Sequence, residues 1–98
     1  MVQAVENLTQ IVGTVMDRLP HPTLAGYDLV AVRIERFQDV EGKANMLTVQ
    51  PGESINVTIR RALLPDGSIG RRIHFRAKRT PDGAMSEPFP APGDFRIE

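Results

Sequence analysis

The stretch Glu53-Ser-Ile-Asn-Val-Thr-Ile-Arg60 places an apolar residue at every second position, with polar or charged residues between them. A second stretch, Arg72-Ile-His-Phe-Arg-Ala-Lys78, has the same alternation. Successive side chains of a β-strand point to opposite faces, so this period of two predicts half-buried antiparallel strands. Both stretches lie next to Gly- and Pro-rich segments, such as Pro65-Asp-Gly67, whose residues are typical of tight turns.

Further segments fit the same all-β pattern. Residues 27–37 alternate as well, with Phe37 on the more polar face. Short strands are expected at 46–49 and 95–97. The segment 69–79 is bracketed by two Pro-Asp-Gly turns, and such a segment most simply pairs with its neighbours on both sides as a meander.

The first nineteen residues admit two interpretations. Apolar residues spaced three and four apart in 1–19 would form one face of a helix. The segment 9–16 is instead rich in β-branched residues and contains Gly13, and both features weaken a helix. We favour a strand over 9–18, with a helix as the alternative.

Five or six short strands in 98 residues predict one small antiparallel barrel, a single domain over 1–98. The strand order resembles the OB-fold, a five-stranded Greek-key barrel that binds oligonucleotides, oligosaccharides or proteins. The resemblance covers residues 9–97. It departs from that fold in the link 62–70, which is too short for the helix usually found there. A small β-sandwich is the alternative.

Composition and targeting signals restrict the function classes. The chain has 12 basic and 12 acidic residues and no cysteine, which excludes disulfides, thiolate metal sites and thiol nucleophiles. The two histidines lack ligand partners at metal-site spacing, and the serines and carboxylates are scattered, so we expect no metal, no cofactor and no enzyme activity. The longest apolar run, 29–32, is far too short for a membrane helix, and no signal peptide is visible. We expect a cytoplasmic protein.

Positive charge is concentrated in residues 58–80, which hold seven basic residues and one acidic residue. The candidates for phosphate contacts are Arg60, Arg72, Arg76 and Lys78. Tyr27 and Phe37 are the candidates for stacking on bases. This pattern predicts binding of single-stranded nucleic acid or another polyanion through a basic strand face. The alternative is that these side chains cover the barrel wall and pair with acidic residues of adjacent strands, such as Glu35.

A proline-rich loop is expected over 80–94, where four prolines occur. Loops of this length in small domains are often functional, and the part around Phe89 would be extended and close to polyproline II. This loop, or an exposed strand, could dock a protein partner or a second copy of the chain. The function predicted is therefore a non-enzymatic binding or assembly module, with polyanion binding first and a protein-interaction or structural subunit as the alternative.

Overall fold

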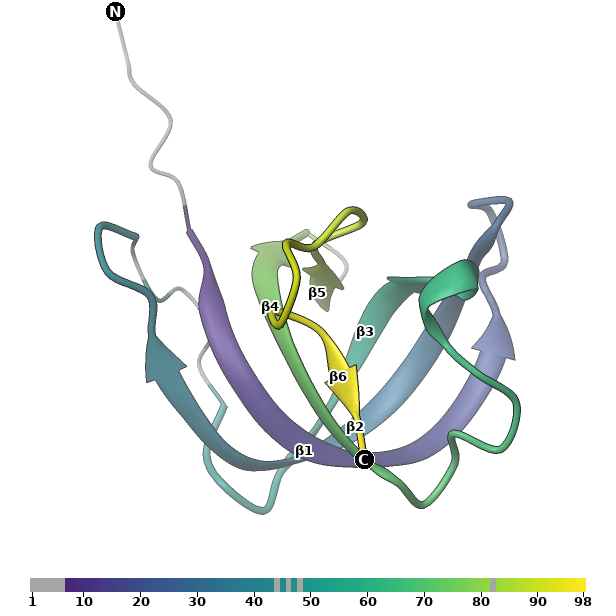
Figure 1. Ribbon diagram of the computed structural model, residues 1–98, viewed down its shortest axis with the longest axis horizontal. Helices are drawn as coiled ribbons and strands as arrows, with labels where there is room; N and C mark the ends of the chain where they lie inside the picture. Colours follow the sequence, from purple (N-terminus) through teal and green to yellow (C-terminus); the bar gives the residue numbers. More distant parts are fainter. Residues whose placement is uncertain (1–6, 44, 46, 48, 82) are drawn as a thin grey trace, which may run out of the picture.

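Six strands and one 3-10 turn form the regular structure of the described residues, which are 7–43, 45, 47, 49–81 and 83–98 of the computed structural model (Figure 1). The elements are β1 (Thr9–Pro20), β2 (Tyr27–Asp39), β3 (Ser54–Arg60), η1 (Arg61–Leu63), β4 (Arg72–Thr80), β5 (Gly83–Ser86) and β6 (Arg96–Ile97). The predicted all-β class is confirmed.

The bounds of these elements decide between the strand and the helix considered for the N-terminal segment, and they test the strand expected over 46–49. Residues 9–20 form a strand, so the helix alternative is wrong for this segment, while residues 1–6 lie outside the described part of the chain. The strand expected over 46–49 is not seen at Leu47 or Val49, which belong to no element, and residues 46 and 48 are outside the described set.

Five strands close into a barrel in the order β1-β2-β3-β5-β4, and β4 returns to β1. Every pairing in this ring is antiparallel except β3–β5, in which Val57 pairs with Ala84 in parallel. A ring with an odd number of strands cannot alternate direction all the way round, so one parallel pairing is unavoidable. The barrel is therefore OB-fold-like, and the short β6 adds to β4 as a sixth strand.

The same topology corrects the prediction that segment 69–79, which contains β4, pairs with the strands before and after it in the chain. β4 pairs with β5 and β1 and not with β3, because β5 occupies the edge of β3. Figure 1 shows β1 and β2 curving strongly through the lower half of the molecule, with β4 and β6 crossing between them. This curvature lets β1 pair with β2 along its whole length and with β4 over residues 9–14.

The interior is packed with the alternate apolar residues that the sequence pattern predicted. Its largest fully buried side chains include Phe75, Ile11, Ile34, Ile59 and Ile73. In place of the helix usual for this type of barrel, residues 61–71 cover one end. Leu64 is buried there, and this segment bonds to β1 through Gly70 N and Val15 O at 2.7 Å.

The expected loop over 80–94 contains a strand. β4 and β5 form a hairpin in which Thr80 pairs with Gly83, and Gly83 has a φ of +137° that suits glycine. The irregular part runs instead from 87 to 95. It contains bends and a turn in which Asp94 N donates to the Ala91 carbonyl at 3.0 Å, and it passes the end of β3 before it reaches β6.

Phe37 lies on the opposite face from the one predicted. The β1–β2 pairing shifts between Val12 and Gly13, which pair with Arg36 and Ile34. The extra residue of β2 breaks the alternation. Phe37 is thereby brought opposite buried Ile11 and packs against the core.

Candidate functional site

A row of outward side chains runs round the barrel across five strands. The register pairs Leu19 with Leu29, Leu29 with Thr58, Thr58 with Met85, and Met85 with Lys78. Directly opposed residues of paired strands have their Cβ atoms about 5 Å apart, so the row is continuous. We call these five residues the lateral row.

Beside the lateral row, Tyr27 and Arg60 are cross-strand partners at the ends of β2 and β3. Arg60 Nε donates to the Pro88 carbonyl at 2.7 Å, and its guanidinium lies 4.6 Å from the centroid of the Phe89 ring. Phe89 is 78% exposed. One aromatic ring therefore lies against this cation, and Tyr27 is its cross-strand neighbour. Arg60 has no carboxylate partner among the described residues.

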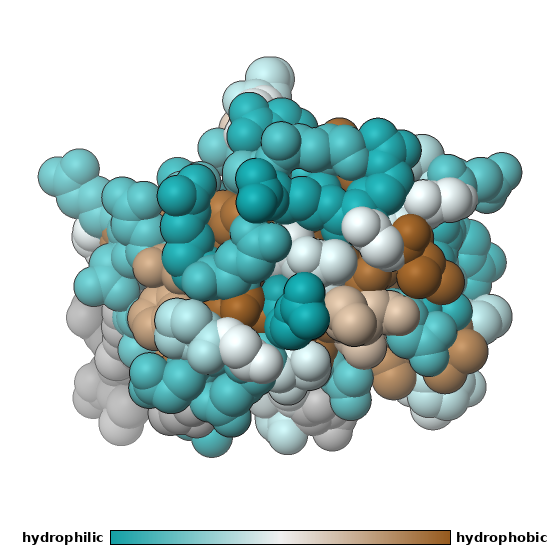
Figure 2. Space-filling model, turned by 90° about the horizontal axis from the view of Figure 1, so that it is seen from below, coloured by the Kyte–Doolittle hydropathy of each residue, from teal (hydrophilic) through white to brown (hydrophobic). Residues whose placement is uncertain are grey.

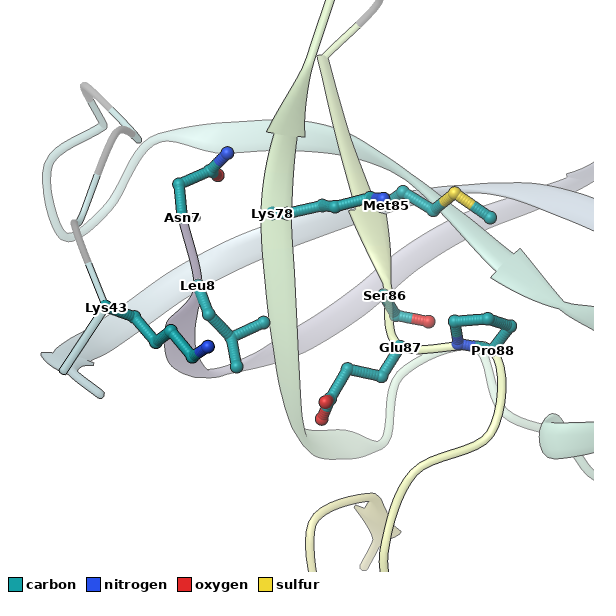
Figure 3. Close-up of a pocket in the computed structure, with 8 residues that line it drawn as sticks. All are labelled: Asn7, Leu8, Lys43, Lys78, Met85, Ser86, Glu87 and Pro88. Atoms are coloured by element: carbon teal, nitrogen blue, oxygen red, sulfur yellow. The ribbon is translucent and has the colours of Figure 1, made fainter. Parts of the chain in front are cut away.

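The other end of the lateral row opens into a cavity of about 450 Å³ (Figure 3). We call it the outer cavity. Lys78 and Met85 belong both to the lateral row and to the wall of this cavity. Leu8 lies on one side of β4, and Glu87 and Pro88 lie on the other, after the end of β5. Lys43 closes the cavity from the loop between β2 and β3. The walls thus combine apolar surface with ammonium groups and one carboxylate.

Glu87 has an unusual environment in this cavity. Its Oε1 is buried and has no hydrogen-bond partner among the described residues. Arg76 is its neighbour on β4, since Glu87 N donates to the Arg76 carbonyl at 3.0 Å, but Arg76 Nε is also buried and unpaired. A buried carboxylate oxygen without a donor costs free energy, so this group is ready to accept a hydrogen bond.

Arg72 and Arg76 lie on a different part of the wall and are already neutralised. Arg72 Nε lies 3.1 Å from a carboxylate oxygen of Glu35, and Arg76 Nη1 lies 3.4 Å from Asp94. Glu35 is the acidic partner that the alternative interpretation of the basic cluster gave as its example. Glu98 adds a second acidic partner, 3.9 Å from Arg72.

The two histidines have local roles. His21 Nδ1 accepts from the amide of Leu24 at 3.0 Å and so caps the turn between β1 and β2. His74 bonds to Glu98, and this hydrogen bond, with the nearby charges of Arg72 and Arg96, lowers the pKa of the Glu98 carboxyl. Within the described residues, no group of three His, Asp or Glu side chains is placed to hold a metal ion.

Exposed apolar side chains mark another surface. Figure 2 shows the underside of the molecule, with hydrophilic side chains over its upper part and hydrophobic ones in patches on both sides of its centre. Apart from Phe89, the large exposed hydrophobic residues of the described chain are Met16, Leu19, Leu24 and Ile69. Leu19 is the member of the lateral row at the end of β1, and Leu24 lies in the loop that follows.

The structure brings together three of the six predicted site residues. Tyr27, Arg60 and Lys78 share the outer wall of β2, β3 and β4. Arg72 and Arg76 are instead held in ion pairs, and Phe37 packs against the core. Sequence reasoning missed Met85, Glu87 and Leu8. Met85 and Glu87 follow the Pro-Asp-Gly turn in alternation, a weak strand signal that the neighbouring prolines obscured.

Comparisons with protein-family models, curated proteins and solved structures found no match to this chain. Among the described residues no helix has the length and apolarity needed to cross a membrane. Function is therefore inferred from the geometry of the outer wall.

Proposed function

We propose that this protein is a non-enzymatic binding module that holds single-stranded nucleic acid on the outer wall of its barrel. The observation that carries the proposal is the grouping of Tyr27, Arg60 and Phe89, in which the guanidinium lies over one ring and Tyr27 is its cross-strand neighbour. Proteins that bind single strands combine aromatic platforms for bases with cations for the backbone, and each stacked base contributes about 1–3 kcal/mol.

The cations of this wall are available for phosphate. Lys78 is exposed and, like Arg60, has no carboxylate within ion-pair distance among the described residues. Arg72 and Arg76 would have to exchange an existing ion pair for a phosphate, so their net gain is smaller. The expected path therefore runs from Tyr27 to Lys78 along the lateral row. Adjacent strands are about 4.8 Å apart, so crossing from β2 to β4 covers about 14 Å.

Fluorescence anisotropy with labelled single-stranded DNA and RNA oligomers, at low and near-physiological salt, tests this proposal. The double variant Arg60→Ala/Lys78→Ala should weaken binding at least about tenfold at low salt, because it removes two cations of this wall that have no carboxylate partner among the described residues. It should also reduce the slope of log K against log salt by about 1.4, which corresponds to two lost phosphate contacts on a single strand.

The matched control is Arg72→Ala/Arg76→Ala, which removes the same charge from the ion-paired part of the wall. It should change affinity less than about threefold. Absence of binding by the native protein at low salt would contradict the proposal. Equal weakening by the two double variants would place the binding surface elsewhere.

The second candidate is a protein-interaction or structural subunit. The observation that favours it is the exposed apolar surface, where Leu19 is 56% and Met16 46% exposed. Exposed apolar groups that gather on one face are typical of protein contacts. Sedimentation over a range of concentrations discriminates, because self-association through this surface raises the mass with concentration and does not depend on oligonucleotide.

A further inference from the structure

A single strand of nucleic acid that followed the lateral row past Lys78 would next reach the outer cavity. Its volume of about 450 Å³ falls within the range of small-ligand pockets. Leu8 and Met85 supply apolar surface on either side of β4, and Pro88 extends it (Figure 3). A flat ring of the size of a nucleobase is the kind of group that such walls accept.

Two charged groups of the cavity demand opposite hydrogen-bonding partners. Glu87 has a carboxylate oxygen that is buried and has no donor, so the side chain must change its rotamer before a ligand can reach both oxygens. Lys78, on the neighbouring strand, is a donor only. A ligand that satisfies both must present N–H groups on one edge and acceptor atoms on another.

Among the bases of a single strand, guanine meets this demand best. Its N1–H and N2–H groups lie side by side and can reach both oxygens of one carboxylate. Its O6 and N7 atoms are acceptors that lysine binds. Thymine and uracil have a single N–H between two carbonyl oxygens, so they would bring an acceptor against the carboxylate.

We propose that the outer cavity selects guanine from a bound single strand, through the Glu87 carboxylate and the Lys78 ammonium over the apolar surface of Leu8 and Met85. The inference rests on the nucleic-acid function proposed above and adds base selectivity to it. Phosphate contacts alone carry no sequence information. The cavity would be the part of the surface that reads a base.

The test uses an oligothymidine of about twelve nucleotides, and variants of it in which one central thymine is replaced by guanine, cytosine or adenine. Fluorescence anisotropy at fixed salt gives the four affinities for each protein. We expect the guanine oligomer to bind native protein about tenfold more tightly than the all-thymine oligomer. The variant Glu87→Gln should reduce this ratio to less than about threefold, because it loses one carboxylate acceptor.

The control variant is Asp66→Asn, which removes one negative charge from an exposed turn outside the cavity and should keep the tenfold ratio. Thermal unfolding of both variants is measured alongside. A Glu87→Gln variant that melts at lower temperature but keeps the native base preference would show that the Glu87 carboxylate contributes to stability alone, and would overturn the inference.

The remaining outcomes separate this inference from the proposed function. Equal, salt-dependent binding of all four oligomers, weakened by Arg60→Ala/Lys78→Ala, leaves the function standing and overturns guanine selection. Failure of every oligomer to bind at low salt removes both. A guanine preference that is the same in the native protein and in Glu87→Gln places base reading outside the cavity.

Discussion

Two buried serines have opposite hydrogen-bonding states. Ser68 and Ser86 are at most 2% exposed. The Ser68 hydroxyl donates to the Pro65 carbonyl and closes the turn that covers one end of the barrel. The Ser86 hydroxyl, on the core side of β5 opposite Ala77, has no partner among the described residues. An unpaired buried hydroxyl is destabilising relative to hydration in the unfolded chain.

The variants Ser86→Ala and Ser68→Ala should therefore change stability in opposite directions. Removing the unpaired hydroxyl should raise the free energy of unfolding by about 1 kcal/mol, and removing the paired one should lower it by about 1 kcal/mol. Urea unfolding followed by circular dichroism measures both values. A loss of stability in Ser86→Ala as large as that in Ser68→Ala would mean that the Ser86 hydroxyl is paired.

At the scale of the element, β1 and β2 owe their shape to two irregularities in their pairing. The register shifts between Val12 and Gly13 and again between Val15 and Asp17. Such irregularities bend a strand and increase its twist, which suits strands that curve round a small barrel. At the first of them the two backbones approach closely. A Cβ atom on Gly13 would lie 2.4 Å from the Arg33 carbonyl oxygen and 2.7 Å from a methyl carbon of Val32.

Gly13→Ala should consequently lower the free energy of unfolding by about 3 kcal/mol, because the strands would have to move apart in the middle of the barrel. Gly26→Ala is the comparison. Nothing lies within 4 Å of a Cβ at that position, but its φ of +81° strains alanine, so a loss of only about 1 kcal/mol is expected. Chemical denaturation of the two variants gives the difference. Equal losses would mean that the close approach at Gly13 relaxes freely.

At the scale of the whole molecule, a buried ion cluster joins segments distant in sequence. Asp28, 3% exposed, accepts from Arg18 Nε at 2.7 Å and from Arg61 Nε at 2.8 Å. Arg18 also donates to the carbonyls of Leu64 and Pro65. The cluster therefore ties β1 and β2 to the segment that covers the end of the barrel. Burial alone raises the pKa of Asp28, but the hydrogen bonds and charges of the two arginines outweigh burial, so the pKa lies below its ordinary value.

Because the pKa of Asp28 is lower in the folded than in the unfolded chain, its stabilising effect is complete above the unfolded value of about 3.9. The effect is lost as pH falls through the folded pKa. Asp28→Asn should lower the free energy of unfolding at pH 7 by about 2 kcal/mol, less than for a fully buried pair because Arg61 is half exposed.

Urea unfolding of native protein and Asp28→Asn between pH 7 and pH 2.5 measures this dependence. The difference between the two proteins should be constant down to about pH 4 and should shrink below it. Glu35→Gln, which removes a more exposed partner of Arg72, is the control and should cost less than about 1 kcal/mol. A difference for Asp28→Asn that does not change with pH would contradict an ionised Asp28.

Closure of the barrel also redistributes the charge seen in the sequence. The basic residues of 58–80 look like one continuous cluster along the chain. In three dimensions Arg61 turns to Asp28, Arg72 to Glu35 and Arg76 to Asp94. Within the described part of the chain, Arg60 and Lys78 on the outer wall have no carboxylate partner.

The sequence by itself determined the all-β class, the strands from 54 to 60 and from 72 to 80, and the turns at Pro-Gly pairs. These features depend on alternation and on backbone preferences within a few residues, both of which are local. The sequence predicted an antiparallel barrel, and although a closed ring of five strands requires a parallel contact, only the structure shows that it joins β3 and β5.

Only the tertiary structure decided which side chains meet. The face of the sheet on which Phe37 lies depends on an extra residue in β2. The burial of Asp28 depends on arginines that are ten and thirty-three residues away, and the neutralisation of Arg76 depends on the chain after β5. The joining of Tyr27, Arg60 and Phe89 depends on cross-strand register and on the path of 87–95. Register between distant strands is set by irregularities and by barrel closure, so no periodicity within one strand can specify it.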